Sequence, residues 1–341
     1  MRGAMKDTIR DRFEVPPAGS WCLVLVLLFG LATTAWSGEK DGQGKAHQKS
    51  ETLRGTIRIS GAWALYPMVV KWSEEFRKRY PGVRVDVSAG GAGKGMTDAL
   101  AGLVDIGMVS REVTPEEIKR GAFFVAVVKD AVFPTMNGGN PVLKRGFTEK
   151  GIKKEGLIDL WIQGRPLTWG DITGGSFNEK VRVYTRSDSC GAAETWAQYL
   201  GGKHQEDLKG VGVYGDPGLA EAVRKDLYGV GYNNLNYAYD FKTGFPLSGL
   251  SILPLDLNGN GRVDPEEDLR TKKQAIQAIH SGVYPSPPSR PLYFATKARF
   301  KDLPRFFVEW ILTEGQKWVE EVGYIPLSPS QAQENLKKLH P

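Results

Sequence analysis

The sequence is poor in the residues that disulfide-stabilised proteins and nucleophilic enzymes need. Among 341 residues there are only two cysteines, Cys22 and Cys190. One cysteine beyond the N-terminal region cannot form a disulfide framework. A cysteine nucleophile would also need a base, and no motif accompanies any of the four histidines, His47, His204, His280 and His340. We therefore expect neither a disulfide scaffold nor an enzyme.

Long apolar runs are also missing, since the main one extends only from Trp21 to Ala32 and is too short to span a bilayer comfortably. A segment with four basic residues precedes it, and Ala35-Trp36-Ser37 follows it. This order is that of a secretory signal. We predict a signal peptide over residues 1–37, cleaved near Ser37–Gly38, and a periplasmic or secreted protein. A retained anchor is the alternative, because the segment before the apolar run is long.

A strong excess of one charge is absent as well. The net charge is +6, and the basic residues are scattered among acids, which excludes a nucleic-acid-binding stripe. Residues 38–54 are polar and predict a disordered tether. About 300 residues remain, enough for two lobes that each bury a core.

Glycine, by contrast, is plentiful in the stretch 83–112. Alternating valines predict a strand at its start, Met96, Leu100 and Leu103 lie on one face of a helix, and a second strand follows. Between the first strand and the helix stand Gly90, Gly91, Gly93 and Gly95. The loop lacks the Ser or Thr of a phosphate-binding P-loop and the spacing of a dinucleotide fingerprint. It predicts exposed N–H groups at a helix N-terminus that suit an anion, although a simple tight turn is the alternative.

Two further strands run into helices in the same way. Thr56–Ile59 alternates as a strand, and Val69, Trp72 and Phe76 predict an amphipathic helix from Leu65. Later, 181–184 predicts a strand and 192–200 a helix, with Arg186, Asp188 and Cys190 in the loop between them. Three such loops indicate a common ligand site.

Breaks in the pattern suggest where the chain passes between lobes. Strands are predicted over 123–128 and 131–136, and the following Asn and Gly residues at 137–141 mark a candidate crossover. A return crossover is predicted in 231–240. The tail contains a predicted strand at 291–296, a helix over 303–322 and a basic, frayed end.

Residues 256–267 show the most specific spacing in the chain. Oxygen-bearing side chains stand at loop positions 1, 3, 5, 9 and 12, and Gly261 stands at position 6. This is the spacing of an EF-hand calcium loop. We predict a structural Ca²⁺ site formed by Asp256, Asn258, Asn260, Arg262 (through its carbonyl), Asp264 and Glu267. A surface turn rich in Asn and Gly is the alternative.

The chain resembles the phosphate-binding component of bacterial ABC importers, a family of type II periplasmic binding proteins. The resemblance rests on ISGAWALYP at 59–67, GGAGKG at 90–95, VDIGMVSR at 104–111, LTWGDI at 167–172, RSDSCG at 186–191, GVGY at 229–232 and GYIPL at 323–327. It implies an α/β fold with two lobes, two crossover connections and a ligand cleft between the lobes. The implied division is lobe 1 over 55–136, lobe 2 over 137–236, and a return to lobe 1 over 237–341 that includes the calcium loop.

The same resemblance implies the ligand positions. Ser110 and Arg186 match ligand-binding positions, and Asp188 matches the acid beside the arginine. The implied set comprises Ala64, Leu65, Tyr66, Ala92, Gly93, Ser110, Arg186, Asp188, Cys190, Gly191 and Ala192. Several of these lack the hydroxyl that the family usually has, and losing one hydrogen bond to a charged ligand costs roughly 1.5 to 3 kcal/mol.

The leading hypothesis is a monomeric binding protein that captures an oxyanion, phosphate first, and delivers it to a membrane permease. The alternative is a ligand-altered relative that binds a different small anion or acts as a sensor or scaffold.

Overall fold

The computed structural model describes residues 53–202 and 204–340. The predicted signal peptide and nearly all of the predicted tether lie outside these residues. Nine strands of the described residues form one sheet, in the order β2-β1-β3-β9-β4-β7-β5-β6, with β8 paired to β4. No helix in these ranges is long and apolar enough to cross a membrane.

Lobe 1 is built around three parallel strands and the helices that follow them. Its elements are β1 (Gly55–Gly61), η1 (Trp63–Leu65), α2 (Tyr66–Arg79), β2 (Val83–Ala89), α3 (Ala92–Ala101), β3 (Ile106–Val109), α4 (Pro115–Lys119), β4 (Ala122–Asn137), β9 (Ser289–Lys297), α12 (Asp302–Thr313), η5 (Gly315–Trp318), α13 (Val319–Val322) and α14 (Pro329–Leu339).

Lobe 2 contains the elements between β4 and β9. They are η2 (Pro141–Lys144), α5 (Phe147–Lys150), α6 (Lys154–Trp161), α7 (Trp169–Thr173), β5 (Arg182–Arg186), α8 (Gly191–Tyr199), η3 (Gln205–Asp207), β6 (Val211–Val213), α9 (Gly215–Lys225), β7 (Gly229–Asn234), α10 (Leu235–Ala238), β8 (Leu250–Ile252), η4 (Pro265–Glu267) and α11 (Lys272–Ser281).

Apolar periodicity explains the elements that the sequence predicted best. Ile57 and Ile59 of β1 are buried while Arg58 between them is exposed, as a half-buried strand requires. Along α2 the buried stripe contains Trp72 and Phe76, as predicted. The βαβ unit from β2 through α3 to β3 is also confirmed, with β1 paired in parallel between the two strands.

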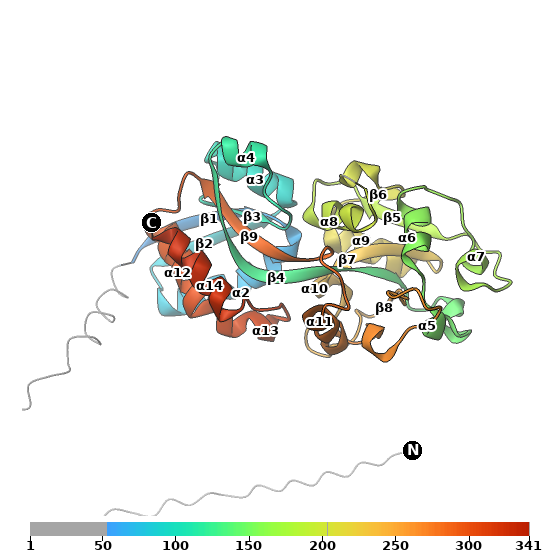
Figure 1. Ribbon diagram of the computed structural model, residues 1–341. Coiled ribbons are helices and arrows are strands. Elements are labelled where there is room, and N and C mark those ends of the chain that lie inside the picture. Colours follow the sequence, from blue (N-terminus) through green and yellow to red (C-terminus); the bar gives the residue numbers. More distant parts are fainter. Residues whose placement is uncertain (1–52, 203, 341) are drawn as a thin grey trace, which may run out of the picture. The chain divides into compact units, whose positions relative to one another are not determined.

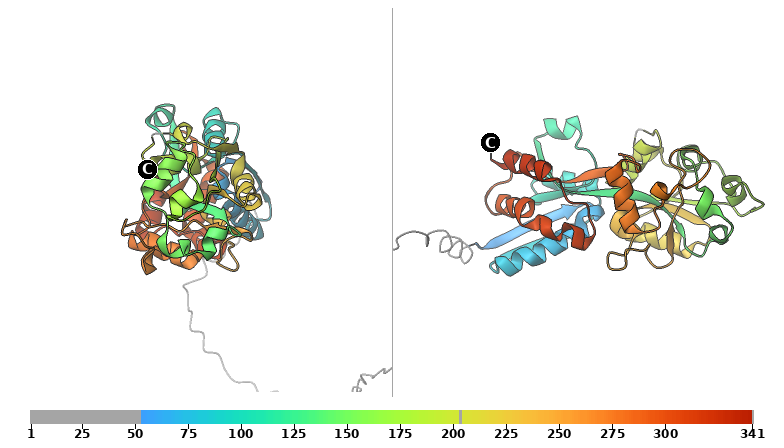
Figure 2. Two further views of the ribbon diagram at one scale, coloured as in Figure 1. Left: turned by 90° about the vertical axis from the view of Figure 1, so that its right-hand side faces the viewer. Right: turned by 60° about the horizontal axis from the view of Figure 1, so that its bottom comes forward.

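Two long antiparallel strands, β4 and β9, join the lobes and run side by side in both ribbon views (Figures 1 and 2). β4 pairs with β9 up to Ala131 and with β7 and β8 beyond it. The sequence predicted two strands here and a crossover at 137–141. The structure has one strand with an irregularity between Ala126 and Val128, and the chain crosses within it.

The second crossing also differs from the prediction. Residues such as Leu253, Leu269 and Ala275 pack into the same apolar cluster as Trp161 and Tyr232 of lobe 2. The chain therefore returns to lobe 1 at β9 rather than in 231–240, and the predicted calcium loop belongs to lobe 2. The physical reason is that apolar residues after 240 complete the core of lobe 2 before the chain leaves it.

The C-terminal end is a helix rather than a frayed segment. Ser328 caps α14 with a capping box, and Leu339 near its end is buried. The Asn335 side chain accepts a hydrogen bond from the Ala126 N–H of β4 at 2.9 Å. The predicted helix over 303–322 is likewise divided, because α12 ends at Thr313 and a short 3-10 turn follows.

Candidate functional site

The site lies where strand-to-helix loops of the two lobes meet. In lobe 1, β2 runs into α3 through Gly90 and Gly91, and in lobe 2, β5 runs into α8 through 187–190. The Gly93 N–H donates to the Ser189 carbonyl at 3.2 Å. The first N–H groups of each helix have no partner within the helix. The topology therefore brings together the N-termini of α3 and α8, which follow two of the three strand-to-helix loops that the sequence singled out.

Glycines allow this close approach. Gly91 has a φ of 93°, and a Cβ there would lie 2.5 Å from the Ser189 carbonyl oxygen. A Cβ on Gly191 would clash with the backbone and hydroxyl of Ser110, which follows β3 in lobe 1. Only a residue without a side chain fits at these contacts. The loops of the two lobes therefore touch each other directly.

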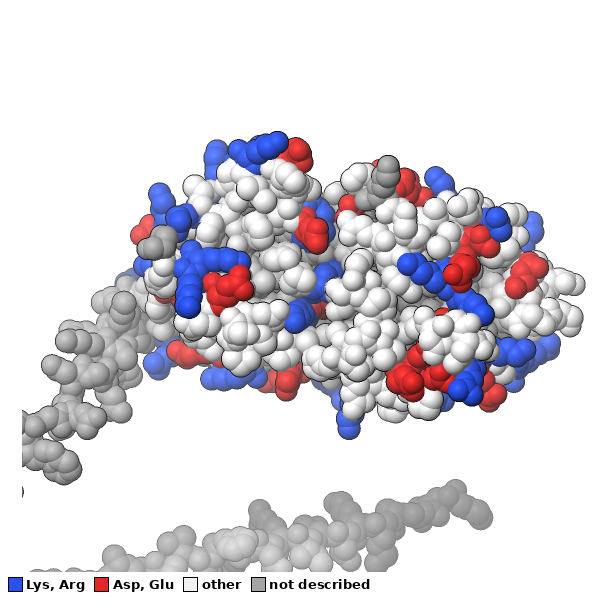
Figure 3. Space-filling view, viewed as in Figure 1, with Lys and Arg blue, Asp and Glu red and all other residues white. Residues whose placement is uncertain are grey.

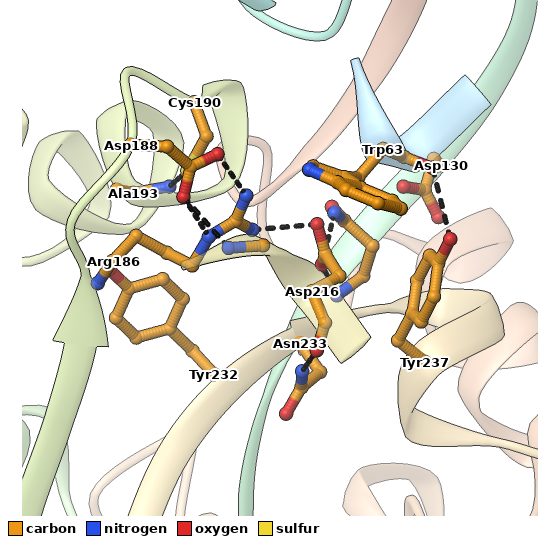
Figure 4. A network of polar contacts seen from close by, with 12 residues as sticks. Trp63, Asp130, Arg186, Asp188, Cys190, Ala193, Asp216, Tyr232, Asn233 and Tyr237 are labelled. Carbon is orange, nitrogen blue, oxygen red and sulfur yellow. Dashed lines mark hydrogen bonds and ion pairs between the residues drawn. The ribbon is translucent and has the colours of Figure 1, made fainter. Parts of the chain in front are cut away.

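Arg186, at the end of β5, is the central cation of this junction, and its side chain is fully buried. Its Nε and Nη2 donate to the two carboxylate oxygens of Asp188 at 2.8 and 2.6 Å. Its Nη1 donates to Asp216 at 2.6 Å. Figure 4 shows the two carboxylates on either side of the guanidinium. Burial lowers the pKa of Arg186, but the charges of Asp216 and Asp188 outweigh it, so the net shift is upward.

The network continues into the strands that join the lobes. The Asn234 amide donates to Asp216 at 2.6 Å and accepts from Nη2 of Arg290 at 2.5 Å. The Nε of Arg290 donates to the Ser110 carbonyl at 3.0 Å, and its Nη1 lies 3.6 Å from Asp130. Burial lowers the pKa of Arg290 and raises that of Asp130 to about 6. Counting Asp188, the buried cluster contains three aspartates and two arginines.

Three buried polar atoms of this region have no hydrogen-bond partner in the described part of the chain. They are Nε1 of Trp63, Nη1 of Arg290 and Oδ2 of Asp130. Trp63 comes from lobe 1, and its ring lies against Gly215 of lobe 2. Buried polar groups are normally paired, so the two unpaired donors, on Trp63 and Arg290, are candidates for contacts with an anionic ligand.

The positions where the resemblance implied hydroxyls are small and buried. Ala92 begins α3, and Ala192 lies in the first turn of α8. Cys190 caps α8, because its Sγ accepts the Ala193 N–H at 3.3 Å. Burial raises the pKa of the Cys190 thiol to about 12. Although His204 lines the same 380 Å³ cavity as Cys190, the thiol therefore remains protonated and is a poor nucleophile.

The residues predicted in the first loop, Ala64, Leu65 and Tyr66, do not present their side chains beside Arg186. Ala64 and Leu65 are buried in the core of lobe 1, so only their backbone could face a ligand. Tyr66 lines a groove of about 590 Å³ together with Lys71 and Tyr237. The hydroxyl of Tyr237 donates to the Trp63 carbonyl at 3.4 Å.

Four residues of the buried network, Asp130, Asp216, Asn234 and Arg290, were not predicted from the sequence. Asp216 had a usable signal, because it follows Gly215 in the first turn of α9, where a fourth strand, β6, runs into a helix. The others stand within or at the end of strands and have no local motif. On the surface seen in Figure 3, acidic and basic residues are intermixed, in agreement with the absence of a basic stripe.

Residues 46–314 match a family model described as a PBP superfamily domain. The chain belongs to this superfamily. Among curated proteins it is 26% identical to the phosphate-binding protein PstS of Bacillus subtilis over 90% of this chain and 94% of that protein. It is 23% identical to PstS of Staphylococcus haemolyticus, over 94% of this chain and 96% of that one. It is also 25% identical to protein SphX of Synechococcus elongatus, over 84% of this chain and 81% of that protein.

Solved structures support the two-lobed α/β fold of this PBP superfamily member. A candidate phosphate ABC transporter substrate-binding protein of Clostridium perfringens, solved with bound phosphate, matches with a TM-score of 0.65 and 21% identity. The match covers 80% of this chain and all of that one. An ABC-type phosphate transport receptor of Vibrio cholerae matches with a TM-score of 0.57 and 20% identity, over the same shares.

Proposed function

We propose that this chain is an extracytoplasmic solute-binding protein that captures a small oxyanion between its lobes and delivers it to an ABC permease. Phosphate is the first candidate. The names of the curated relatives and the phosphate bound in the Clostridium perfringens protein support this choice. Capture rather than catalysis also agrees with the protonated thiol of Cys190.

The proposal rests on how the Arg186 guanidinium is hydrogen-bonded and oriented. A guanidinium has five N–H donors, and Asp188 and Asp216 accept three of them. One N–H remains on each of Nη1 and Nη2, and the two carboxylates fix the direction of the guanidinium plane. The first N–H groups of α8, those of Gly191 and Ala192, lie five and six residues along the chain, where a helix N-terminus favours negative charge.

Isothermal titration calorimetry on ligand-stripped protein tests this site. We expect phosphate to bind with a dissociation constant of micromolar or lower. Arg186→Ala would leave two buried carboxylates unpaired and destabilise the fold, so Arg186→Lys is the sharper variant. It retains the charge but loses the two-pronged pairing. A lost charge-assisted hydrogen bond is worth about 1.5–3 kcal/mol, so binding should weaken at least about tenfold.

Arg182 provides the matched control. It stands on the same strand, its side chain is 65% exposed, and it pairs with Asp226 at 3.1 Å. Arg182→Lys should leave the affinity unchanged. If Arg186→Lys bound phosphate as tightly as wild type while its melting temperature matched wild type, the proposed site would be wrong.

A second candidate function is binding of a different small anion. The buried apolar side chains of Ala92 and Ala192, with the thiol of Cys190, favour it, because they supply no hydroxyl donor. Mass spectrometry of the ligand released from purified protein separates the two candidates. Calorimetry with arsenate, sulfate and small carboxylates then ranks the anions.

A further inference from the structure

The loop over residues 256–267, between β8 and α11 of lobe 2, takes no part in the proposed anion site. Among the described residues there is no group of three or more His, Cys, Asp or Glu side chains gathered to hold a metal ion. A calcium loop does not require such a group, because Asn side chains, a backbone carbonyl and water complete its oxygen shell. Whether the loop can hold a calcium ion therefore depends on the contacts within the loop.

Those contacts orient the two end carboxylates toward the loop backbone. The Gly261 N–H, at position 6, donates to Oδ2 of Asp256 at position 1, at 2.8 Å. Glu267 at position 12 accepts the Asn258 N–H at 2.8 Å on Oε1 and the Asp264 N–H at 3.0 Å on Oε2. Both oxygens of Glu267 thus face the loop, as bidentate chelation requires.

The second oxygen of Asp256 points independently to a cation. The Asp256 side chain is completely buried, and its Oδ1 has no hydrogen-bond partner in the described structure. The Gly261 N–H binds the other oxygen of the same carboxylate, so the carboxylate is anchored to the loop backbone. A buried carboxylate oxygen without a partner is costly unless a cation compensates it. The nearest ammonium, on Lys153, lies 4.0 Å from Oδ2 and donates to the Gly259 carbonyl at 2.8 Å.

We propose that the loop over residues 256–267 binds one Ca²⁺ ion, with Oδ1 of Asp256 as a direct ligand. The Asn258 and Asn260 side-chain oxygens, the Arg262 carbonyl and both oxygens of Glu267 complete six ligands, within the six to eight that calcium takes. Position 9 of such loops often acts through water. Asp264 fits that role, because its Oδ2 already accepts both asparagine amides, at 2.8 and 2.7 Å.

The ion would fasten two separate segments of lobe 2 together. The loop already contacts α5 and the segment that follows it, since the Val263 N–H donates to the Glu149 carbonyl of α5 at 2.7 Å and the Asp256 N–H donates to the Ile152 carbonyl at 3.0 Å. Lys153 follows in the same segment. Binding of Ca²⁺ would place a divalent charge where the Lys153 ammonium now approaches Asp256. It would also hold the loop against α5 and the segment that follows α5.

The first test uses the mature wild-type protein, from which metal has been removed with a chelator. Calorimetric titration with CaCl₂ should show one site, and millimolar Ca²⁺ should raise the melting temperature by about 5 °C, as expected for a ligand well above its dissociation constant. MgCl₂ should raise it less, because Mg²⁺ demands a smaller octahedral shell. No calcium uptake, or an equal effect of both ions, would overturn the proposal.

Variants then locate the ion. Glu267→Gln should abolish the shift, whereas Glu266→Gln, one residue earlier and exposed, is the matched control and should retain it. Lys153→Gln should strengthen calcium binding several-fold by removing the competing ammonium. If Glu267→Gln fails to fold, Asp256→Asn replaces it, and the wild-type titration remains decisive. A shift that both Glu267→Gln and Asp256→Asn retain would place the ion elsewhere. Both variants should bind phosphate as tightly as wild type, so failure of the calcium site and failure of the anion site can be told apart.

Discussion

Asp130 offers a direct test of the electrostatics of the site. It stands on β4 where the strand passes between lobes, and it is completely buried. Its Oδ1 accepts the Leu235 N–H at 3.2 Å, and its Oδ2 has only the distant Arg290 guanidinium, at 3.6 Å. We propose the change Asp130→Asn, which preserves the shape but removes the titratable group. Arg290 retains hydrogen bonds to the Ser110 carbonyl and Asn234 in this variant.

The magnitude follows from the pKa shift. Burial raises the pKa of Asp130 from 3.8 to about 6 in the folded protein. Between these values the folded state binds more protons than the unfolded state, so the free energy of unfolding falls as the pH rises. One pKa unit corresponds to about 1.4 kcal/mol, so the whole contribution of Asp130 is about 3 kcal/mol, of which about 2.5 kcal/mol is lost between pH 4 and pH 7. The protonated carboxyl of Asp130 therefore makes its full contribution to the free energy of unfolding only below the unfolded pKa of 3.8.

The assay is urea unfolding of the ligand-free wild type and the variant between pH 4 and pH 7, followed by tryptophan fluorescence. Other groups titrate in both proteins, so the difference between the two curves isolates Asp130. The free energy of unfolding of the wild type should fall by about 2.5 kcal/mol relative to that of Asp130→Asn as the pH rises from 4 to 7. A difference that is flat, or that rises with pH, would refute the reasoning about the buried carboxylate.

Two further predictions concern the third loop and the missing hydroxyls. Because the pKa of Cys190 is about 12, alkylation by iodoacetamide at pH 8 should be on the order of 10³-fold slower in native protein than in urea; a rate within tenfold of the unfolded one would show that the thiol is accessible and ionised. The combined variant Ala92→Ser, Cys190→Ser and Ala192→Thr should bind phosphate more tightly by calorimetry, since each hydroxyl adds a donor at a helix N-terminus. An unchanged or weaker affinity would favour the alternative ligand.

Local sequence patterns predicted the parts of the site that depend on neighbouring residues. Glycine loops identified the strand-to-helix turns, and Arg186 and Asp188 are close enough in sequence to pair, as they do. Arg290 and Asp130 could not be predicted in this way. They come from strands far apart in the sequence, and only the pairing of β4 with β9 brings them together.

The lobe boundaries show a similar limit. Turn-forming residues at 137–141 suggested a crossing, but a strand can pass between two cores without any break when both of its halves are apolar, as β4 does. The later apolar residues up to Tyr284 carry no sign of which core they join. Their assignment depends on long-range packing, which the periodicity of a single segment does not contain.

The pairing of Ala131 with Ser289 has a consequence for the architecture of the chain. The two residues are antiparallel partners, and the Val132 N–H donates to the Pro288 carbonyl at 3.3 Å just beyond them. Antiparallel strands can be joined by a two-residue hairpin turn. Lobe 2 is thus an insertion into a hairpin of lobe 1, and replacing it with a short turn would close β4 directly onto β9. The separate apolar core of lobe 1 makes that excised protein a candidate for independent folding.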